Sequence, residues 1–217
     1  MDRPTPRSLV LDLLSTLRGR SLPVAALVEA GRIFGLSEPS LRVAVTRLRA
    51  SGLLERDERG LYRMGAAALP VDRQVRAWRH REEEAVRWSG AWIGVQLPAA
   101  GPRGRPRRAR ALRLLGFRPL SPALQLRPDN LRGGVERVRR DLQALGLEPD
   151  ALVARLSELD PRGEARARGL WDVPALRAGW ARSRRELEAS EARLARLSPQ
   201  RAMAESFVLG GRVIREI

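Results

Sequence analysis

The sequence predicts an α+β protein made of three successive parts. Near the N-terminus, apolar residues recur at helical spacing and then alternate as in strands. In the middle, strand and helix patterns alternate, and the last part is helical in pattern. The 217 residues are enough to bury more than one core. With no Cys and one His, a disulfide framework, a thiolate metal site and a His-rich metal centre are excluded.

The first part is expected to fold as three short helices and a β-hairpin. The helices are predicted over residues 7–19, from a cap at Ser21, and over residues 37–51. Ser37 is a suitable cap for the third helix, and Pro39 suits its first turn. Residues 53–56 and 61–64 predict two strands joined by a polar turn. Three helices followed by such a hairpin form a winged helix-turn-helix, which we place within residues 1–66.

Two further domains and a connecting helix are expected. Residues 67–87 predict the polar connecting helix. Within residues 88–160, strand, helix, two short strands, helix and strand are predicted over residues 91–97, 107–115, 116–127, 131–145 and 152–156. This β-α-β-β-α-β order is ferredoxin-like. Residues 161–217 predict a C-terminal helical domain, with helices over 174–197 and 199–217. In it, Arg182, Arg184 and Arg185 precede Glu186, Glu188 and Glu191, which predicts i,i+4 ion pairs.

The third helix has the two faces that a DNA-reading helix requires. Its inward side chains are Leu41, Ala44, Val45 and Leu48. Its outward side chains, expected in the major groove, are Ser40, Arg42, Val43, Thr46, Arg47 and Arg49. Arginine can bond guanine O6 and N7, and the threonine methyl can contact that of thymine. In the hairpin, Arg56, Arg59 and Arg63 are expected to meet the DNA backbone or minor groove. The alternative is an ordinary three-helix bundle with solvated arginines.

The charge predicts an anionic partner. All 41 basic residues are Arg, and against 25 acidic residues they give a formal net charge of +16. Residues 98–140 hold 12 Arg and two acidic residues, so this segment alone carries +10. The candidate phosphate contacts in it are Arg103, Arg105, Arg107 and Arg108. Three interpretations stay open for them: a solvated loop, a contact with the DNA backbone, and a grip on the phosphates of an acyl-CoA.

Several segments resemble the PaaX family, repressors first described for phenylacetate degradation. At the expected recognition helix these are residues 35–48 and Gly52-Leu53-Leu54. Collinear with them are Trp88-Ser89-Gly90-Ala91-Trp92 and residues 114–120, 126–130 and 205–210. The resemblance implies a winged-helix domain, a ferredoxin-like middle domain and a helical C-terminal domain. It also implies a homodimer on double-stranded operator DNA that an acyl-CoA effector releases.

No catalytic or metal-binding constellation is apparent, so neither an enzyme nor a cofactor is expected. The middle domain resembles the fold of a CRISPR-associated endonuclease, but its first strand, 92–97, has no carboxylate for a metal. No apolar run reaches the ~20 residues of a membrane span, so a cytoplasmic protein without a membrane partner is expected. Two alternatives to an operator-binding repressor stay open. One is nonspecific nucleic-acid binding through residues 98–140, and the other is a small-molecule-binding module without operator binding.

Overall fold

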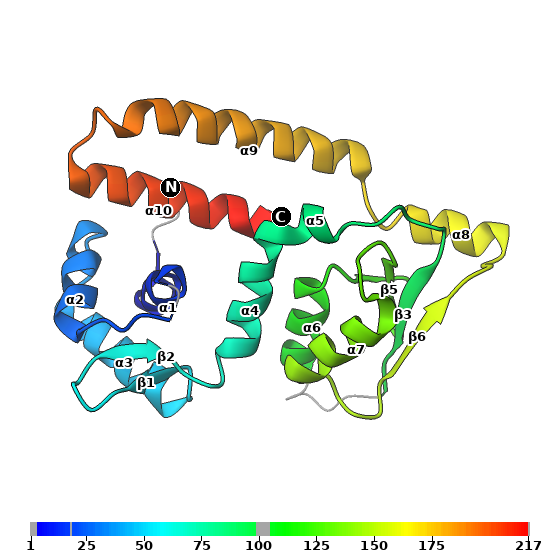
Figure 1. Ribbon diagram of the computed structural model, residues 1–217, viewed down its shortest axis with the longest axis horizontal. Coiled ribbons are helices and arrows are strands. Elements are labelled where there is room, and N and C mark those ends of the chain that lie inside the picture. Colours follow the sequence, from blue (N-terminus) through cyan, green and yellow to red (C-terminus); the bar gives the residue numbers. More distant parts are fainter. Residues whose placement is uncertain (1–3, 18, 99–104, 217) are drawn as a thin grey trace. The chain divides into compact units, whose positions relative to one another are not determined.

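The computed structural model describes residues 4–17, 19–98 and 105–216, and its contacts group the chain into two compact units (Figure 1). One unit joins the residues up to Leu69 to those from Val173 onward, and the other is Pro70–Asp172. The last two helices therefore share a unit with the N-terminal helices, although residues 70–172 separate them in the sequence. The division into residues 1–66, 67–87, 88–160 and 161–217 stays a prediction about which segments fold independently.

The N-terminal segment forms the expected helices and hairpin. They are α1 (Pro6–Thr16), α2 (Val24–Ile33), α3 (Glu38–Ala50), β1 (Leu54–Arg56) and β2 (Tyr62–Met64). Ser37 caps α3 as predicted, because its hydroxyl accepts the Ser40 backbone N–H. The cap predicted at Ser21 is wrong, since α2 begins after Pro23 without a side-chain cap. The reason is that Leu22 is extended and exchanges two backbone hydrogen bonds with Tyr62, at 2.9 and 2.7 Å.

One apolar core holds this arrangement together. Its fully buried members include Leu9 and Leu14 on α1, Leu27 on α2, Leu41 and Leu48 on α3, and Leu54 on β1. Burying a leucine side chain contributes roughly 1.5–3 kcal/mol, so α3 is anchored by its inward face. Ala204, Phe207 and Val208 from the last helix pack against the same core. The C-terminal segment is therefore part of the scaffold that fixes α3.

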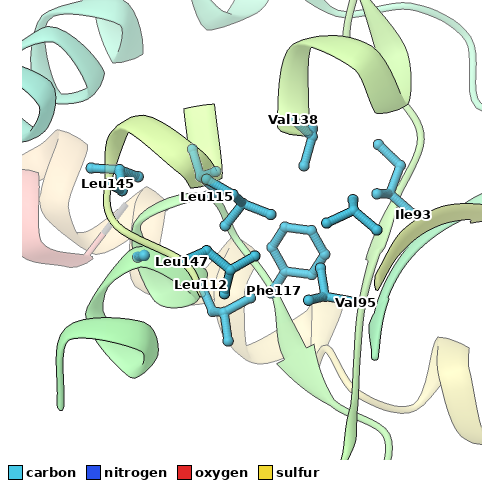
Figure 2. Packing of buried hydrophobic residues seen from close by; sticks show 11 residues of the cluster. Ile93, Val95, Leu112, Leu115, Phe117, Val138, Leu145 and Leu147 are labelled. Carbon is cyan, nitrogen blue, oxygen red and sulfur yellow. The ribbon is translucent and has the colours of Figure 1, made fainter. Parts of the chain in front are cut away.

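The second unit is built on a four-stranded antiparallel sheet. Its strands are β3 (Trp92–Gln96), β4 (Arg118–Pro119), β5 (Leu124–Pro128) and β6 (Leu152–Leu156), in the order β4-β5-β3-β6. Its helices are α6 (Arg105–Leu114), between β3 and β4, and α7 (Gly134–Ala144), between β5 and β6. This is the element order expected from the sequence. Figure 2 shows the core between these helices and the sheet, in which Phe117 lies among Ile93, Val95 and Val138.

The other face of the sheet carries an aromatic cluster. Trp92 alternates with Ile93 on β3 and therefore points to the opposite face. There its ring packs against Trp88 at 4.9 Å and Trp171 at 5.8 Å between centroids. Its indole N–H donates to Glu164 at 2.9 Å. Glu164 lies on α8 (Pro161–Arg168), a helix that the sequence analysis did not predict.

The expected single connecting helix is interrupted. Residues 69–84 form α4 (Leu69–Ala77), the 3-10 turn η1 (Trp78–His80) and α5 (Arg81–Glu84). The chain then becomes extended and pairs with the segment before α7. The Val86 N–H donates to Asn130 O at 3.0 Å, and the Arg132 N–H donates to Glu84 O at 2.9 Å. These backbone bonds end the helix before residue 87.

The C-terminal helices α9 (Val173–Leu194) and α10 (Pro199–Glu216) form an antiparallel pair (Figure 1). The Ser190 hydroxyl and the Arg193 guanidinium both donate to Glu205, at 2.6 and 2.7 Å. These two hydrogen bonds lower the pKa of the Glu205 carboxyl. Glu186 pairs with Arg212 of α10, so the i,i+4 pair predicted for Glu186 with Arg182 does not form. In the part of the chain that the structure describes, no helix is long and apolar enough to cross a membrane.

Candidate nucleic-acid interface

Helix α3 presents most of its predicted contact residues to solvent. Leu41, Val45 and Leu48 are buried against the core, which leaves the opposite side of the helix free. The exposed side chains are Arg42, Val43, Thr46, Arg47 and Arg49. Val43 is 49% exposed, which is unusual for a large apolar side chain and suits contact with a base methyl group. The structure thus brings five of the six predicted α3 residues together on one accessible face.

Two hydroxyls on α3 bond to the helix itself. Ser40 is half-buried, and its hydroxyl donates to Ser37 O at 2.7 Å. Thr46 is exposed, and its hydroxyl donates to Arg42 O at 3.0 Å. Both hydroxyl protons are therefore engaged in hydrogen bonds within the protein. For contact with a ligand, each side chain has an acceptor oxygen, and Thr46 also has a methyl group.

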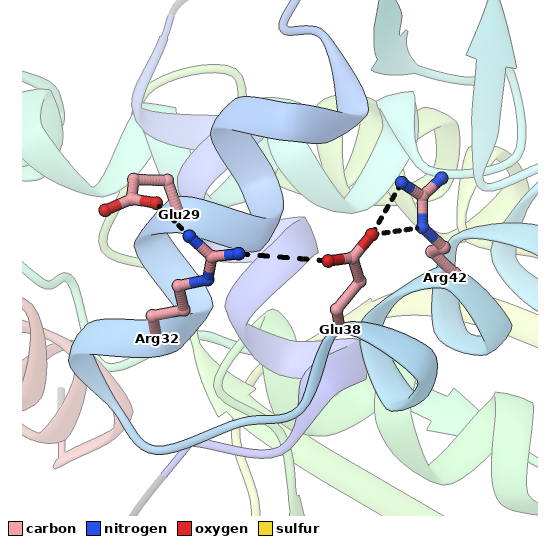
Figure 3. Close-up of polar contacts among 4 residues, drawn as sticks. All are labelled: Glu29, Arg32, Glu38 and Arg42. Carbon is pink, nitrogen blue, oxygen red and sulfur yellow. Dashed lines mark hydrogen bonds and ion pairs between the residues drawn. The ribbon is translucent and has the colours of Figure 1, made fainter.

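Arg42 is held by a carboxylate on its own helix. Its Nε and Nη2 lie 2.8 and 2.7 Å from Glu38 Oε1. The other carboxylate oxygen of Glu38 faces Arg32 at 3.9 Å, and Arg32 pairs with Glu29 at 3.0 Å. Figure 3 shows these four side chains as a chain of alternating charge from α2 to α3. Because Glu38 occupies the Nε side of Arg42, the end formed by the two terminal nitrogens is the edge that can face guanine.

The sequence analysis missed the role of Glu38. The signal was present in its spacing, because Glu38 precedes Arg42 by four residues, the better orientation for a helical ion pair. The pair is only partly exposed, with 56% of the Arg42 side chain and 41% of the Glu38 side chain accessible. By pairing with Arg42, Glu38 restricts the positions that the Arg42 guanidinium can take.

The three predicted hairpin arginines differ in their surroundings. Arg63 lies directly across from Glu55, and the two side chains pair at 3.2 Å. The Arg56 guanidinium lies 6.0 Å from the ring centre of Tyr62. Arg59 is exposed in the turn, whose shape Asp57 fixes by accepting the backbone N–H groups of Arg59 and Leu61. Among the described residues, Arg59, like Arg47 and Arg49 on α3, has no carboxylate partner.

The hairpin is fixed against the end of α3 by a close approach of two backbones. A Cβ atom at Gly65 would lie 2.3 Å from Gly52 O, a distance that no side chain tolerates. The Gly65 N–H donates to Leu53 O at 2.8 Å. Glu55 adds a bond, because its carboxylate accepts the Ala66 N–H at 3.2 Å. The hairpin arginines and α3 therefore belong to one rigid surface.

The basic segment of the second unit is less available than its charge suggests. Arg103 lies outside the described residues, and Arg105 is exposed at the start of α6. Arg107 Nε donates to Leu145 O at 3.3 Å, and Arg108 donates to Pro98 O at 3.1 Å and faces Glu148 at 3.6 Å. Two of the predicted phosphate contacts thus bond to neighbouring segments of the protein. In the described part of the chain, the exposed arginines of α6 that make neither a hydrogen bond nor an ion pair are Arg110 and Arg113.

A second arginine cluster, absent from the sequence predictions, lies between α5, β5 and α7. Arg81, Arg127 and Arg137 line a cavity with room for about one water molecule. Arg127 is 6% exposed and donates to Leu115 O at 2.9 Å and to Asn130 Oδ1 at 3.4 Å. Burial and the charge of Arg81 lower the pKa of Arg127 to about 10. This cluster joins elements of the second unit, and its cavity is too small for an acyl-CoA.

The sequence comparisons concern the N-terminal segment. Residues 5–68 match the family described as PaaX-like protein. The N-terminal domain is PaaX-like. The match covers α1 to the end of the hairpin, the same segment that carries the exposed α3 face. A PaaX-like domain implies DNA binding and transcriptional regulation, in a family that is generally non-enzymatic.

The whole chain is similar in structure to an uncharacterized protein, Rv0674, from Mycobacterium tuberculosis. The identity is 23%, the TM-score is 0.51, and the alignment covers 98% of this chain and 82% of that one. At this identity the likeness shows the fold alone, and it extends over both units. Among curated proteins, none matches this chain in sequence.

Other candidate chemistry in the molecule is sparse. Within residues 4–17, 19–98 and 105–216, no group of three or more His, Asp and Glu side chains is placed to hold a metal ion. His80 is exposed beside Glu83 at 3.4 Å. The exposed face of α3 in the PaaX-like domain is therefore the candidate functional site.

Proposed function

We propose that the chain is a homodimeric transcriptional regulator, a repressor, whose PaaX-like domain reads operator DNA. In fold terms we assign the N-terminal domain to the winged helix-turn-helix class and the middle sheet to the ferredoxin-like class. The observation that supports this function most is the exposed face of α3, where Glu38 pairs with Arg42. On the same face, Arg47 and Arg49 have no carboxylate partner among the residues that the structure describes. A regulator of chromosomal genes works beside the DNA, so we place it in the cytoplasm.

The side chains divide by the contact that each can make. Arg42, Val43 and Thr46 lie on the exposed face of α3 and are proposed to contact base edges. The remaining candidates are proposed to contact phosphates, which sets register and affinity: Ser40, Arg47, Arg49, Arg56, Arg59 and Arg63. A two-fold symmetric dimer presents two α3 helices about one helical turn of DNA apart or a multiple of it, so the operator should be an inverted repeat.

The test is a comparison of the chain's own upstream DNA with a scrambled fragment at ~150 mM salt, where long-range attraction is screened. A preference of about a thousandfold for the upstream fragment supports operator binding. In Arg42→Ala, binding to the upstream fragment should weaken by roughly 1–3 kcal/mol, while binding to scrambled DNA stays nearly unchanged. An equal loss on both fragments would show that Arg42 touches only phosphate.

We further propose that an acyl-CoA effector releases the DNA by favouring a dimer whose α3 spacing does not fit the operator. The support is the family resemblance, together with the basic residues 105–113, whose arginines suit the phosphates of coenzyme A. Phenylacetyl-CoA and free coenzyme A are the probes. Loss of operator binding with the first and not the second supports an acyl-specific effector.

The second candidate function is nonspecific nucleic-acid binding through the basic segment 98–140. The observation that favours it is that Arg110 and Arg113 on α6 are exposed and have no ion pair with any residue that the structure describes. Under this alternative, Arg110→Ala with Arg113→Ala weakens DNA binding more than any change on α3, and the upstream and scrambled fragments bind alike.

A further inference from the structure

The second unit holds a groove at the edge of its sheet where β3 begins and β6 ends. These two strands are antiparallel, and Trp92 and Leu156 form the last pair at this edge. The groove has a volume of about 440 Å³ and is lined by residues 89–91, Arg155, residues 157–159 and Glu164 of α8. Volumes of about 300–1,000 Å³ are typical of sites for small molecules. The groove is therefore large enough for a ligand, and the proposed contact with DNA uses none of its residues.

Glu158 lines this groove in a backbone conformation that glutamate rarely adopts. Its φ is 58°, and among the described residues it is the one residue other than glycine with a positive φ. Residues held in such conformations concentrate at binding sites, where the surrounding structure maintains them. The Glu158 carboxylate is exposed and makes neither a hydrogen bond nor an ion pair with any residue that the structure describes. No contact of its side chain within the described chain therefore accounts for this conformation.

Hydrogen-bond donors line the same groove. Arg155 is fixed in place, because its Nε donates to Asp129 at 3.0 Å and its Nη2 donates to Ser89 Oγ at 3.3 Å. Its Nη1 has no partner within the described residues, and 53% of the side chain is accessible. The Ser89 oxygen accepts from Arg155, so its hydroxyl proton is left to donate, and the exposed Ser157 hydroxyl has no partner in the described part of the chain. These donors suit a carboxylate, whereas the free Glu158 carboxylate suits an ammonium group.

The rest of the groove is either apolar or already bonded within the protein. The two oxygens of Glu164 accept the Trp92 indole N–H at 2.9 Å and the Arg168 Nε–H at 2.7 Å. Leu159 lines the groove and packs against the aromatic cluster of the sheet. Because that cluster holds Leu159 in place, it offers a fixed apolar contact to the carbon side chain of a ligand.

We infer that this groove binds a free α-amino acid with an apolar side chain. The ammonium group of the ligand pairs with Glu158, and its carboxylate accepts from Arg155 and the two serine hydroxyls. The ligand side chain packs on Leu159. Three residues of chain span at most about 11 Å, so the two charged side chains that bracket the ligand arise close together. This spacing suits a ligand whose opposite charges are both attached to one carbon atom.

The phosphates of an acyl-CoA do not match this groove. Asp129 already balances the charge of Arg155, and the unpaired Glu158 carboxylate repels a further anion. The amino-acid site is therefore distinct from that of the effector in the proposed function. Its test needs neither DNA nor an acyl-CoA, so its outcome leaves operator reading to be judged separately.

The first test is calorimetric titration of the full chain with L-leucine, L-valine, L-methionine and L-phenylalanine. We expect at least one of them to bind with a dissociation constant below about 1 mM. For leucine, isocaproate lacks the ammonium group and isoamylamine lacks the carboxylate, and each should bind at least about tenfold more weakly. No binding of any of the four at about 10 mM overturns the inference, and so does an analogue that binds as tightly as its amino acid.

The second test uses variants of Glu158 in the same titration. Glu158→Gln keeps the shape and removes the charge, and it should weaken amino-acid binding by about tenfold or more. Glu82→Gln is the matched control, since Glu82 is an exposed glutamate of α5 without a hydrogen bond or ion pair to the described residues. It should change the affinity less than about twofold. A Glu158→Gln protein that binds as tightly as the wild type overturns the site.

Glu158→Gly separates binding from a structural role of this side chain. Glycine adopts a positive φ freely, so we expect the melting temperature to rise by about 2 °C while amino-acid binding is lost. Glu158→Gln keeps the strained backbone and should melt within about 1 °C of the wild type. A Glu158→Gly protein that melts below the wild type would show that the side chain stabilises the turn itself, which contradicts its assignment to a ligand.

Discussion

Replacing Glu38 with glutamine tests whether this carboxylate orients Arg42 or merely masks its charge. The wild-type carboxylate accepts from two nitrogens of Arg42, at 2.8 and 2.7 Å, on a partly exposed helix face. The glutamine side chain has nearly the same shape, lacks the charge and holds the guanidinium less firmly. The two roles make opposite predictions for operator DNA: loss of an orienting group weakens operator binding, whereas loss of a masking charge strengthens it.

The expected magnitudes follow from the geometry. An exposed ion pair of this kind contributes about 0.2–1 kcal/mol to stability, so Glu38→Gln should unfold at nearly the wild-type temperature. Ordering an arginine side chain costs about 2 kcal/mol of rotamer entropy. If Glu38 supplies half of that ordering before DNA binds, its loss costs about 1 kcal/mol, which weakens operator binding about fivefold. Nonspecific binding should instead strengthen a few-fold, because one negative charge beside the phosphates is gone.

The assay is fluorescence anisotropy titration of operator and scrambled duplexes at two salt concentrations. Glu29→Gln is the matched control, since Glu29 belongs to the same charged chain but touches Arg32 and not Arg42 (Figure 3). We expect it to strengthen binding to both duplexes alike. If Glu38→Gln behaves in the same way as Glu29→Gln, the carboxylate supplies charge alone and the orienting role is wrong.

Three further substitutions test the packing inside the two units. Gly65→Ala should lower the free energy of unfolding by about 1–3 kcal/mol in urea titrations, because its Cβ would meet Gly52 O; Gly179→Ala, with no atom within 4 Å of its Cβ, should instead be neutral or stabilising by up to about 1 kcal/mol. Phe207→Ala removes a ring 5.2 Å from that of Phe34, the residue that follows α2, and should lower the free energy of unfolding by about 2–4 kcal/mol. Arg127→Met leaves the buried Leu115 O without its donor and should cost about 1–3 kcal/mol. Since the native pKa of Arg127 is lowered to about 10, the folded protein releases this proton before the unfolded chain does, so wild-type stability relative to Arg127→Met should rise above about pH 10.

Local patterns in the sequence were sufficient to predict most of the elements. The third helix and its Ser37 cap, the hairpin and the last strand, Leu152–Leu156, occur where they were expected. Each of these elements depends on neighbours within a few residues: an apolar period, a cap or a turn. The predictions that were wrong concern residues that pair with segments remote in the sequence. Ser21 is no cap because Leu22 pairs with Tyr62, forty residues away, and the connecting helix ends early because its last residues pair with the segment around Asn130.

The sequence by itself determined the helical and strand periods, the uneven distribution of positive charge and the exposed face of α3, since these are properties of a residue and its near neighbours. The tertiary structure decided which arginines remain available. Arg63 is paired because the hairpin register sets it opposite Glu55, and Arg107 is turned toward Leu145 O on a segment 38 residues away. It also decided that α9 and α10 pack with the N-terminal helices and leave one apolar side of α9 uncovered. Such outcomes depend on distances between segments remote in the chain, and no local pattern encodes those distances.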